Sequence, residues 1–191
     1  MMGKESTKET TAKLKRYVLL SDDVDQDSAR QIMQDLFKLE AEDPTSDIVM
    51  IINSSGGYVN CMWGIIDSMN LLRCAVHTLC VGNALSAAAL ILMSGNDGKR
   101  YATPNSRIMI HQISAGFHGT TKNLETQARE ILRLEEMSKD LVIKETKITK
   151  QLLEKMISND WYLSAFEAQK LGVIDKVITN FGEVKAKGAS W

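Results

Sequence analysis

The chain has 191 residues, of which 44% are hydrophobic and 25% are charged, and this is enough for one globular domain with its own core. The net charge of −1 gives no electrostatic reason to expect binding to nucleic acid or to an acidic membrane. No apolar run in the sequence approaches the length needed to span a bilayer.

Residues 1–16 and the three cysteines point to a cytoplasmic protein. We expect a polar N-terminal tail over 1–16, since this stretch lacks the apolar core of a signal peptide and its glutamates argue against a transit peptide. Cys61, Cys74 and Cys80 are odd in number and lack the spacing of a metal site. We interpret them as small buried residues in a reducing compartment and expect no metal site.

The first half of the chain alternates between strand-like and helix-like segments. Residues 17–20 form a short predicted strand, and an apolar face then predicts a helix that ends before Pro44. Residues 48–52 are continuously apolar, which is typical of a strand covered on both faces. A tight turn over 53–57 precedes a helix from about Val59, a strand over 76–81 and a helix over 86–93. This order implies an α/β fold with right-handed crossovers.

The second half contains one unusually long helical pattern. A turn at Pro104 leads into a strand that ends at His111, and residues 120–148 then carry an apolar stripe at helical spacing. A helix of this length does not fit easily within one small domain. It could protrude, in which case Leu124, Ile131 and Leu134 should be buried only in an oligomer, or it could fold back on its own domain. Further on, residues 164–167 form a capping box.

Three polar residues stand at positions where chemistry is feasible. Ser86 lies at the predicted corner between a strand and a helix, where a hydroxyl can cap the helix or act as a nucleophile beside free amides. The corner alone favours the cap. His111 ends a strand, and Asp160 precedes an aromatic strand-like turn. An imidazole and a carboxylate are the partners that a nucleophilic hydroxyl needs, although each residue could equally be an ordinary surface or turn residue.

Several segments of the chain, in this order and at this spacing, resemble one family. The segments are residues 39–44, 52–57, 81–92, 98–112, 128–132, 163–165 and 172–175. They resemble the proteolytic subunit of the Clp protease, the ClpP family of serine peptidases, from Arg16 to about Val177. The run 104–112 is the specific part of the match.

The resemblance implies a ClpP/crotonase-like α/β fold of repeated β-α-β units with a protruding helix-strand handle. The implied peptidase domain covers 17–178, with the handle at about 113–148 and a C-terminal tail over 179–191. The implied roles are nucleophile, general base and orienting acid for Ser86, His111 and Asp160. The implied oxyanion hole is formed by the amides of Gly57 and Ala87, and the implied substrate-binding residues are Gly56, Tyr58, Ser114 and Ala115.

The resemblance also implies the reaction and the partners. The chain would be a serine endopeptidase subunit of a self-compartmentalised protease, with heptameric rings stacked as a tetradecamer. Its substrates would be unfolded polypeptides delivered by an AAA+ Clp ATPase. The subunit itself would need no cofactor, because ATP would be used only by the unfoldase.

Three features depart from the family pattern. The segment before the first strand is shorter than the family's usual axial gate. Ser158 and Asn159 stand where many members place an acidic residue and an arginine that pair across the ring interface. Ile113 stands where the family usually has proline, and Ala115 where it often has glycine.

Two other functions remain open from the residues alone. A crotonase-like hydratase or isomerase would also use paired backbone amides as an oxyanion hole, and a non-catalytic ring or scaffold subunit would need no triad. An α/β-hydrolase is disfavoured because Ser86 lacks the Gly-x-Ser-x-Gly elbow.

Overall fold

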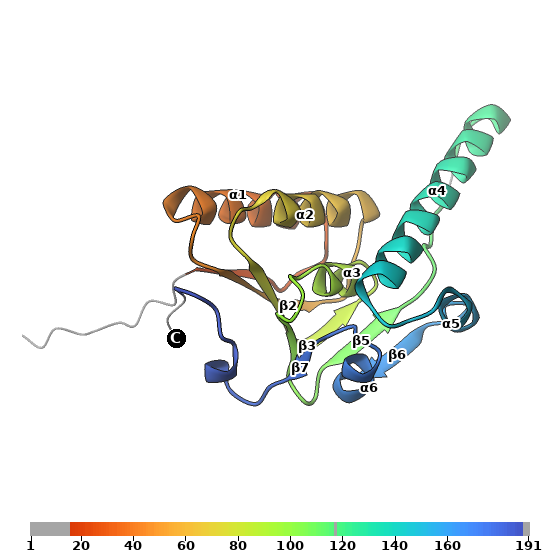
Figure 1. Ribbon diagram of the computed structural model, residues 1–191. Coiled ribbons are helices and arrows are strands. Elements are labelled where there is room, and N and C mark those ends of the chain that lie inside the picture. Colours follow the sequence, from red (N-terminus) through yellow and green to blue (C-terminus); the bar gives the residue numbers. More distant parts are fainter. Residues whose placement is uncertain (1–15, 117, 189–191) are drawn as a thin grey trace, which may run out of the picture.

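The computed structural model describes residues 16–116 and 118–188, so the predicted N-terminal tail lies outside the described residues apart from Arg16. Within the described residues, seven strands form one sheet flanked by helices (Figure 1). In chain order the elements are β1 (Tyr17–Leu20), α1 (Gln26–Glu42), β2 (Ile48–Ser54), α2 (Val59–Leu71), β3 (Val76–Leu85), α3 (Ala87–Met93), β4 (Arg100–Ala102), β5 (Arg107–Ile110), α4 (Thr121–Glu145), α5 (Lys150–Met156), β6 (Trp161–Ser164), α6 (Ala165–Lys170), β7 (Lys176–Val177) and the 3₁₀-helix η1 (Phe181–Glu183).

The sheet is largely parallel, as the order of the predicted elements implies. Strands β1, β2, β3, β4 and β7 are neighbours in that order, and each adjacent pair is parallel. The far end of β3 also pairs with β5 in parallel, and β5 pairs with β6 in antiparallel fashion. The predicted α/β fold class is therefore confirmed. The pairing of β3 with β5 brings the ends of the two strands together. Ser86 follows β3 and His111 follows β5, so these two residues leave neighbouring strands.

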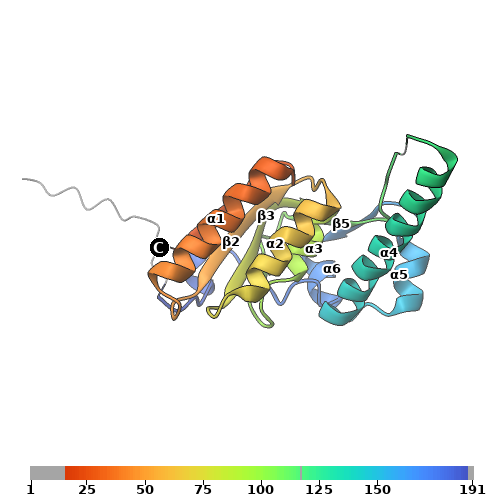
Figure 2. The same ribbon diagram turned by 90° about the horizontal axis from the view of Figure 1, so that it is seen from above.

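Helices cover one face of the sheet and the end of the chain covers part of the other. Helices α1 and α2 lie side by side above the strands (Figure 2). On the opposite face a smaller cluster joins the strand residues Val49, Leu79 and Tyr101 to Ile178 and Val184. This double coverage explains why residues 48–52 are continuously apolar. Residues 179–188, which belong to the predicted C-terminal tail, continue to pack on the sheet through Val184 and Ala186.

Two element boundaries differ from the sequence-based expectation. Strand β3 continues four residues beyond Val81, because Asn83, Ala84 and Leu85 pair with β5. Gly82 lies inside this strand with a φ of +95°, a conformation that glycine adopts without steric cost. The long helix α4 ends at Glu145, and Thr146 has extended backbone angles (φ −132°, ψ 179°). Helix α5 follows after a short break.

Helix α4 both packs on the domain and projects from it. Its C-terminal part contacts α3 and α5, and Leu134 and Val142 are buried. Its N-terminal part stands clear of the body in both ribbon views (Figures 1 and 2). Leu132 is 66% exposed there. Leu134 is buried in a single chain, where only 9% of it is exposed. The expectation that it becomes buried only in an oligomer is therefore wrong.

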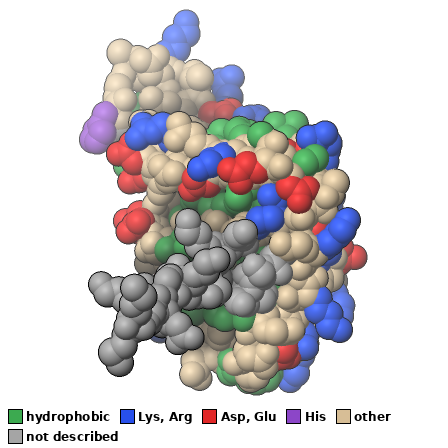
Figure 3. Space-filling model, turned by 90° about the vertical axis from the view of Figure 1, so that its left-hand side faces the viewer, with side chains coloured by type: hydrophobic (Ala, Val, Ile, Leu, Met, Phe, Trp, Pro, Cys, Tyr) green, Lys and Arg blue, Asp and Glu red, His purple; other side chains and the backbone are tan. Residues whose placement is uncertain are grey.

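The face of the molecule shown in Figure 3 carries both acidic and basic side chains. On the face shown in Figure 3, acidic and basic side chains are interspersed with hydrophobic and uncharged ones. Every helix in the described part of the chain is too short or too polar to cross a bilayer. Cys74 and Cys80 are buried free thiols, and burial raises the pKa of the Cys80 thiol to about 11.

Candidate active site

Ser86 occupies a strained corner between β3 and α3. Its φ is +53° and its ψ is −123°, a conformation that a residue with a side chain rarely adopts. Such strain costs roughly 1–3 kcal/mol, so the surrounding structure must enforce it. The backbone N–H of Ser86 donates to the Met109 carbonyl at 2.8 Å, and the pairing of β3 with β5 holds the corner in place.

The hydroxyl of Ser86 does not cap helix α3. Although Ser86 occupies the N-cap position, its side chain makes no capping hydrogen bond. Instead, the distance from its Oγ to Nε2 of His111 is 2.7 Å. The simpler interpretation of Ser86 as a helix cap is therefore wrong, because the hydroxyl is directed at an imidazole.

Strand register brings His111 and Asp160 together. In the antiparallel pair of β5 and β6, Ile110 lies opposite Trp161. His111 follows Ile110 and Asp160 precedes Trp161, so the next pair of residues along the ladder is His111 and Asp160. Nδ1 of the imidazole is 3.3 Å from Oδ1 of the carboxylate. The three polar residues selected from the sequence thus form one contiguous chain of contacts, 74 positions apart at its ends in the sequence.

This chain of contacts is partly open to solvent in a single subunit. The His111 side chain is 27% exposed and the Asp160 side chain is 55% exposed. The arrangement lets Nε2 accept the hydroxyl proton of Ser86 while Nδ1 donates toward Asp160. An imidazole held at both nitrogens in this way has a fixed tautomer and orientation.

Two residues whose backbone amides have no acceptor within the described chain line the same cavity as Ser86. Gly57 and Ala87 both line this cavity. Within the described residues, no protein group accepts a hydrogen bond from either N–H. Amides with no protein acceptor beside a nucleophile are suited to stabilise a developing oxyanion. The family resemblance implies an oxyanion hole at these two residues, and that role stays a prediction.

The turn that carries Gly57 tolerates only glycine at two successive positions. Gly56 has a φ of +92° and Gly57 a φ of +152°. A Cβ at Gly56 would lie 2.5 Å from the Leu85 carbonyl oxygen, and a Cβ at Gly57 would lie 2.4 Å from the Val24 carbonyl oxygen. Because neither glycine has a side chain, this turn can lie close both to the Ser86 corner and to the backbone of Val24.

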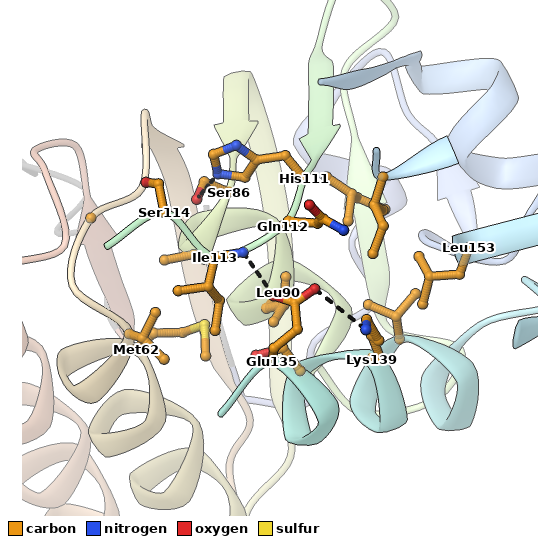
Figure 4. Close-up of a pocket in the computed structure, with 17 residues that line it drawn as sticks. Met62, Ser86, Leu90, His111, Gln112, Ile113, Ser114, Glu135, Lys139 and Leu153 are labelled. Carbon is orange, nitrogen blue, oxygen red and sulfur yellow. Dashed lines mark hydrogen bonds and ion pairs between the residues drawn. The ribbon is translucent and has the colours of Figure 1, made fainter. Parts of the chain in front are cut away.

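A cavity extends from Ser86 and His111 toward helix α4, and it has two chemically different ends (Figure 4). Its apolar wall comes from α2, α3, β5, α4 and α5, and comprises Val59, Met62, Leu90, Ile110, Val142, Leu153 and Ile157. Glu135 and Lys139 of α4 line the same cavity and form an ion pair, which lies below His111 in the view of Figure 4. The cavity beside Ser86 therefore combines an apolar wall with one pair of opposite charges.

The predicted substrate-binding residues divide into two groups. Ser114 lines the cavity, whereas Gly56, Tyr58 and Ala115 are not among the residues that line it. Tyr58 is 69% exposed and begins α2. The structure therefore brings only Ser114 of these four to the cavity wall.

Sequence reasoning missed the residues that close the cavity from the C-terminal half of the chain. Leu153 comes from α5 and Ile157 directly follows that helix, while Glu135 and Lys139 come from α4. The spacing of Glu135 and Lys139 is that of an ordinary exposed helix pair, so the sequence offers no signal that they face inward. Among the described residues, no group of three or more His, Cys, Asp or Glu side chains has the arrangement of a metal site.

A family model supports the interpretation of the fold. The model described as Clp protease matches residues 2–181, which is most of the chain. The matched region contains the Ser86 corner, the strand that ends at His111 and the turn that carries Asp160. On this match and the parallel α/β sheet, the chain belongs to the Clp protease family.

Proposed function

We propose that this protein is a serine endopeptidase subunit, with Ser86 as nucleophile, His111 as general base and Asp160 as the acid that orients the imidazole. The observation that carries the proposal is the 2.7 Å contact between Oγ of Ser86 and Nε2 of His111. A serine whose hydroxyl is directed at an imidazole, and beside two amides with no protein acceptor, has the parts that acyl transfer requires.

The first half of the reaction follows from this geometry. As Oγ of Ser86 attacks the scissile carbonyl carbon, the hydroxyl proton passes to Nε2 of His111. The carbonyl oxygen becomes an oxyanion, which the N–H groups of Gly57 and Ala87 stabilise by hydrogen bonds. Asp160 stabilises the imidazolium that forms. The tetrahedral intermediate then collapses, the C–N bond breaks, and His111 gives its proton to the leaving amine.

The second half reverses these roles with water. The acyl group is now attached to Oγ of Ser86, and His111 is neutral again. A water molecule gives a proton to Nε2 of His111 as its oxygen attacks the acyl carbon, and the same two amides hold the second oxyanion. Collapse breaks the bond to Oγ, which recovers its proton from the imidazolium. The products are a carboxylic acid and the regenerated hydroxyl.

We propose unfolded polypeptides as the substrates. The segment after His111 supports this, because Ser114 lines the cavity and residues 111–116 have no strand partner within the described chain. Unpaired backbone groups beside a nucleophile suit an extended peptide that adds as a strand. Recognition through main-chain atoms tolerates many sequences, and a folded substrate does not offer such a strand.

We also propose assembly into heptameric rings stacked as a tetradecamer, with an AAA+ unfoldase as the partner that uses ATP. The projecting part of α4 supports assembly, because it stands clear of the body of the domain and leaves this stretch of helix open to contact with a second copy. Membership of the Clp protease family supports the ring and the ATPase partner. Cleavage inside such a ring would be confined to chains that the partner threads into it.

A crotonase-like enzyme or a scaffold subunit fits the site less well. A crotonase-like enzyme would use the backbone amides of the Gly57 turn, and a scaffold subunit would use no catalytic group. Neither needs a hydroxyl that is activated by an imidazole. The contact between Ser86 and His111, together with the strain at Ser86, is useful only for a nucleophile.

A fluorophosphonate probe tests the proposal directly. The probe should label the wild-type chain at Ser86, as located by peptide mass spectrometry, and should leave Ser86→Ala unlabelled. Native mass spectrometry of the same samples gives the subunit number. Labelling at a different serine, with full peptide hydrolysis by Ser86→Ala, would disprove the assignment.

A further inference from the structure

The chain segment that follows the catalytic histidine is held to α4 by one side chain. The N–H of Ile113 donates to Oε2 of Glu135 at 2.8 Å across 22 residues of sequence. Strand β5 ends at Ile110, so this segment no longer has a neighbouring strand. Within residues 112–116, the Ile113 amide is the only backbone group for which the described chain provides a hydrogen-bond partner.

Glu135 is partly buried in the cavity wall, and a cation balances its charge. Its side chain is 13% exposed, and its Oε1 lies 3.6 Å from Nζ of Lys139, whose side chain is 16% exposed. Nζ of Lys139 also contacts Glu136 at 2.8 Å. A carboxylate with so little solvent access needs such partners, because an unpaired buried charge is costly. The hydrogen bond that Lys139 donates to Glu136, together with the nearby Glu135 charge, raises the pKa of Lys139.

The contact acts two residues from the imidazole. Ile113 is separated from His111 only by Gln112, and all three residues line the cavity together with Glu135. Figure 4 shows the Ile113 N–H directed at Glu135, while His111 reaches Ser86 from the other end of the same short segment. A shift of this segment would move the imidazole relative to Oγ of Ser86. Misplacement by about 1 Å costs on the order of 10² in rate.

We propose that Glu135 is a positioning residue: by accepting the Ile113 N–H, it fixes the segment that carries His111 and ties the catalytic geometry to helix α4. Lys139 holds the Glu135 carboxylate in the orientation that makes this contact. The proposal rests on the proposed peptidase function. It adds that the position of α4, the helix that projects toward other subunits, controls the activity of Ser86.

Variants at the two ends of the hydrogen bond test the proposal. Glu135→Ala removes the acceptor and Ile113→Pro removes the donor, since proline has no N–H. Each should lower kcat for a short fluorogenic peptide about tenfold or more and slow fluorophosphonate labelling similarly, with KM changed less than about threefold. Glu135→Gln keeps an acceptor oxygen and should retain kcat within about threefold of wild type. The double variant should be no worse than either single variant, because both remove the same contact.

Glu136→Ala is the matched control. It removes the other carboxylate that contacts Lys139 at 2.8 Å, on the same helix, but it leaves the Ile113 contact in place. Its kcat should stay within about twofold of wild type. All variants are sized by sedimentation, and Ile113→Pro leaves α4 itself unaltered, so a loss of kcat at unchanged particle size excludes failed assembly as the cause.

Three results would overturn the positioning role: wild-type kcat in Glu135→Ala, wild-type kcat in Ile113→Pro, or losses that multiply in the double variant. Absence of Ser86 labelling in the wild type would instead reject the proposed peptidase function. If the wild type is labelled at Ser86, the variants test the positioning role alone. If the wild type is not labelled, the peptidase proposal itself is rejected.

Discussion

The Gly56 turn offers the sharpest test of how the fold supports the Ser86 corner. In Gly56→Ala, the new Cβ would lie 2.5 Å from the Leu85 carbonyl oxygen, 2.9 Å from the Ser86 Cβ and 3.0 Å from the Ala87 nitrogen. All three atoms belong to the corner itself, so relief requires that the corner move. A φ of +92° adds conformational strain of roughly 1–2 kcal/mol. Overpacking of a fixed contact typically costs roughly 1–3 kcal/mol, so the free energy of unfolding should fall by about 2–5 kcal/mol.

The same displacement should disable the chemistry more than the fold. Loss of one oxyanion donor costs about 10²–10³ in rate, and Gly56→Ala would disturb both the donor at Ala87 and the nucleophile. Gly98→Ala is the matched control, since Gly98 has a φ of +74° and a Cβ there would meet nothing within 4 Å. It should lose only about 1–2 kcal/mol and keep its rate. Urea unfolding and fluorogenic peptide hydrolysis measure both effects. If the two variants showed equal stability and equal rates, the close approach of Gly56 to the corner would not matter and the reasoning would fail.

Three further predictions concern the triad, acid stability and assembly. His111→Ala and Asp160→Asn should each lower kcat by about 10²–10⁴, and the double variant should match His111→Ala, whereas multiplied losses would argue against a triad. Burial by itself would raise the pKa of Asp175, but its hydrogen bonds from Arg100 outweigh this and hold the pKa below its usual value. The resulting stability is present above about pH 4 and is lost as the pH falls further, so Asp175→Asn should flatten the acid side of a urea-midpoint profile; an unchanged slope would contradict it. Leu132→Asp, at a position that is 66% exposed, should reduce the particle size in sedimentation without loss of secondary structure, and an unchanged particle would exclude Leu132 from the interface.

Local sequence signals predicted the parts of the site but not their meeting. Ser86 was found because a lone hydroxyl begins a small apolar helix, and His111 because it ends a strand. Their contact depends on the pairing of β3 with β5, and the approach of Asp160 depends on the register of β5 with β6. Both pairings are non-local. They extend β3 to Leu85, beyond the strand-like run that ends at Val81. The family resemblance supplied what local propensity could not.

The part of α4 that faces the cavity could not be predicted from the sequence, for a different reason. An apolar stripe over 120–148 predicts which face of a helix is buried, but not where along its length the helix leaves the domain. The change occurs near Leu134: most residues of α4 before this position are exposed, whereas most residues from Leu134 onward are buried or half-buried. Glu135 lies just after this change, so a residue that resembles a surface charge in the sequence lies in the cavity wall. Only the packing of α4 against α3 and α5 decides this.

The departure from the family pattern at Ile113 gains a physical meaning from Glu135. A proline at this position would have no N–H to donate, so the contact to α4 requires the departure. The contact joins the segment that follows His111 to a helix whose other end projects from the domain. If assembly through α4 stabilises the geometry in which His111 meets Ser86, thermodynamic reciprocity requires that a ligand favouring this geometry stabilise the assembly by the same factor. Subunit association and active-site occupancy would then be two readouts of one equilibrium, connected through a single carboxylate.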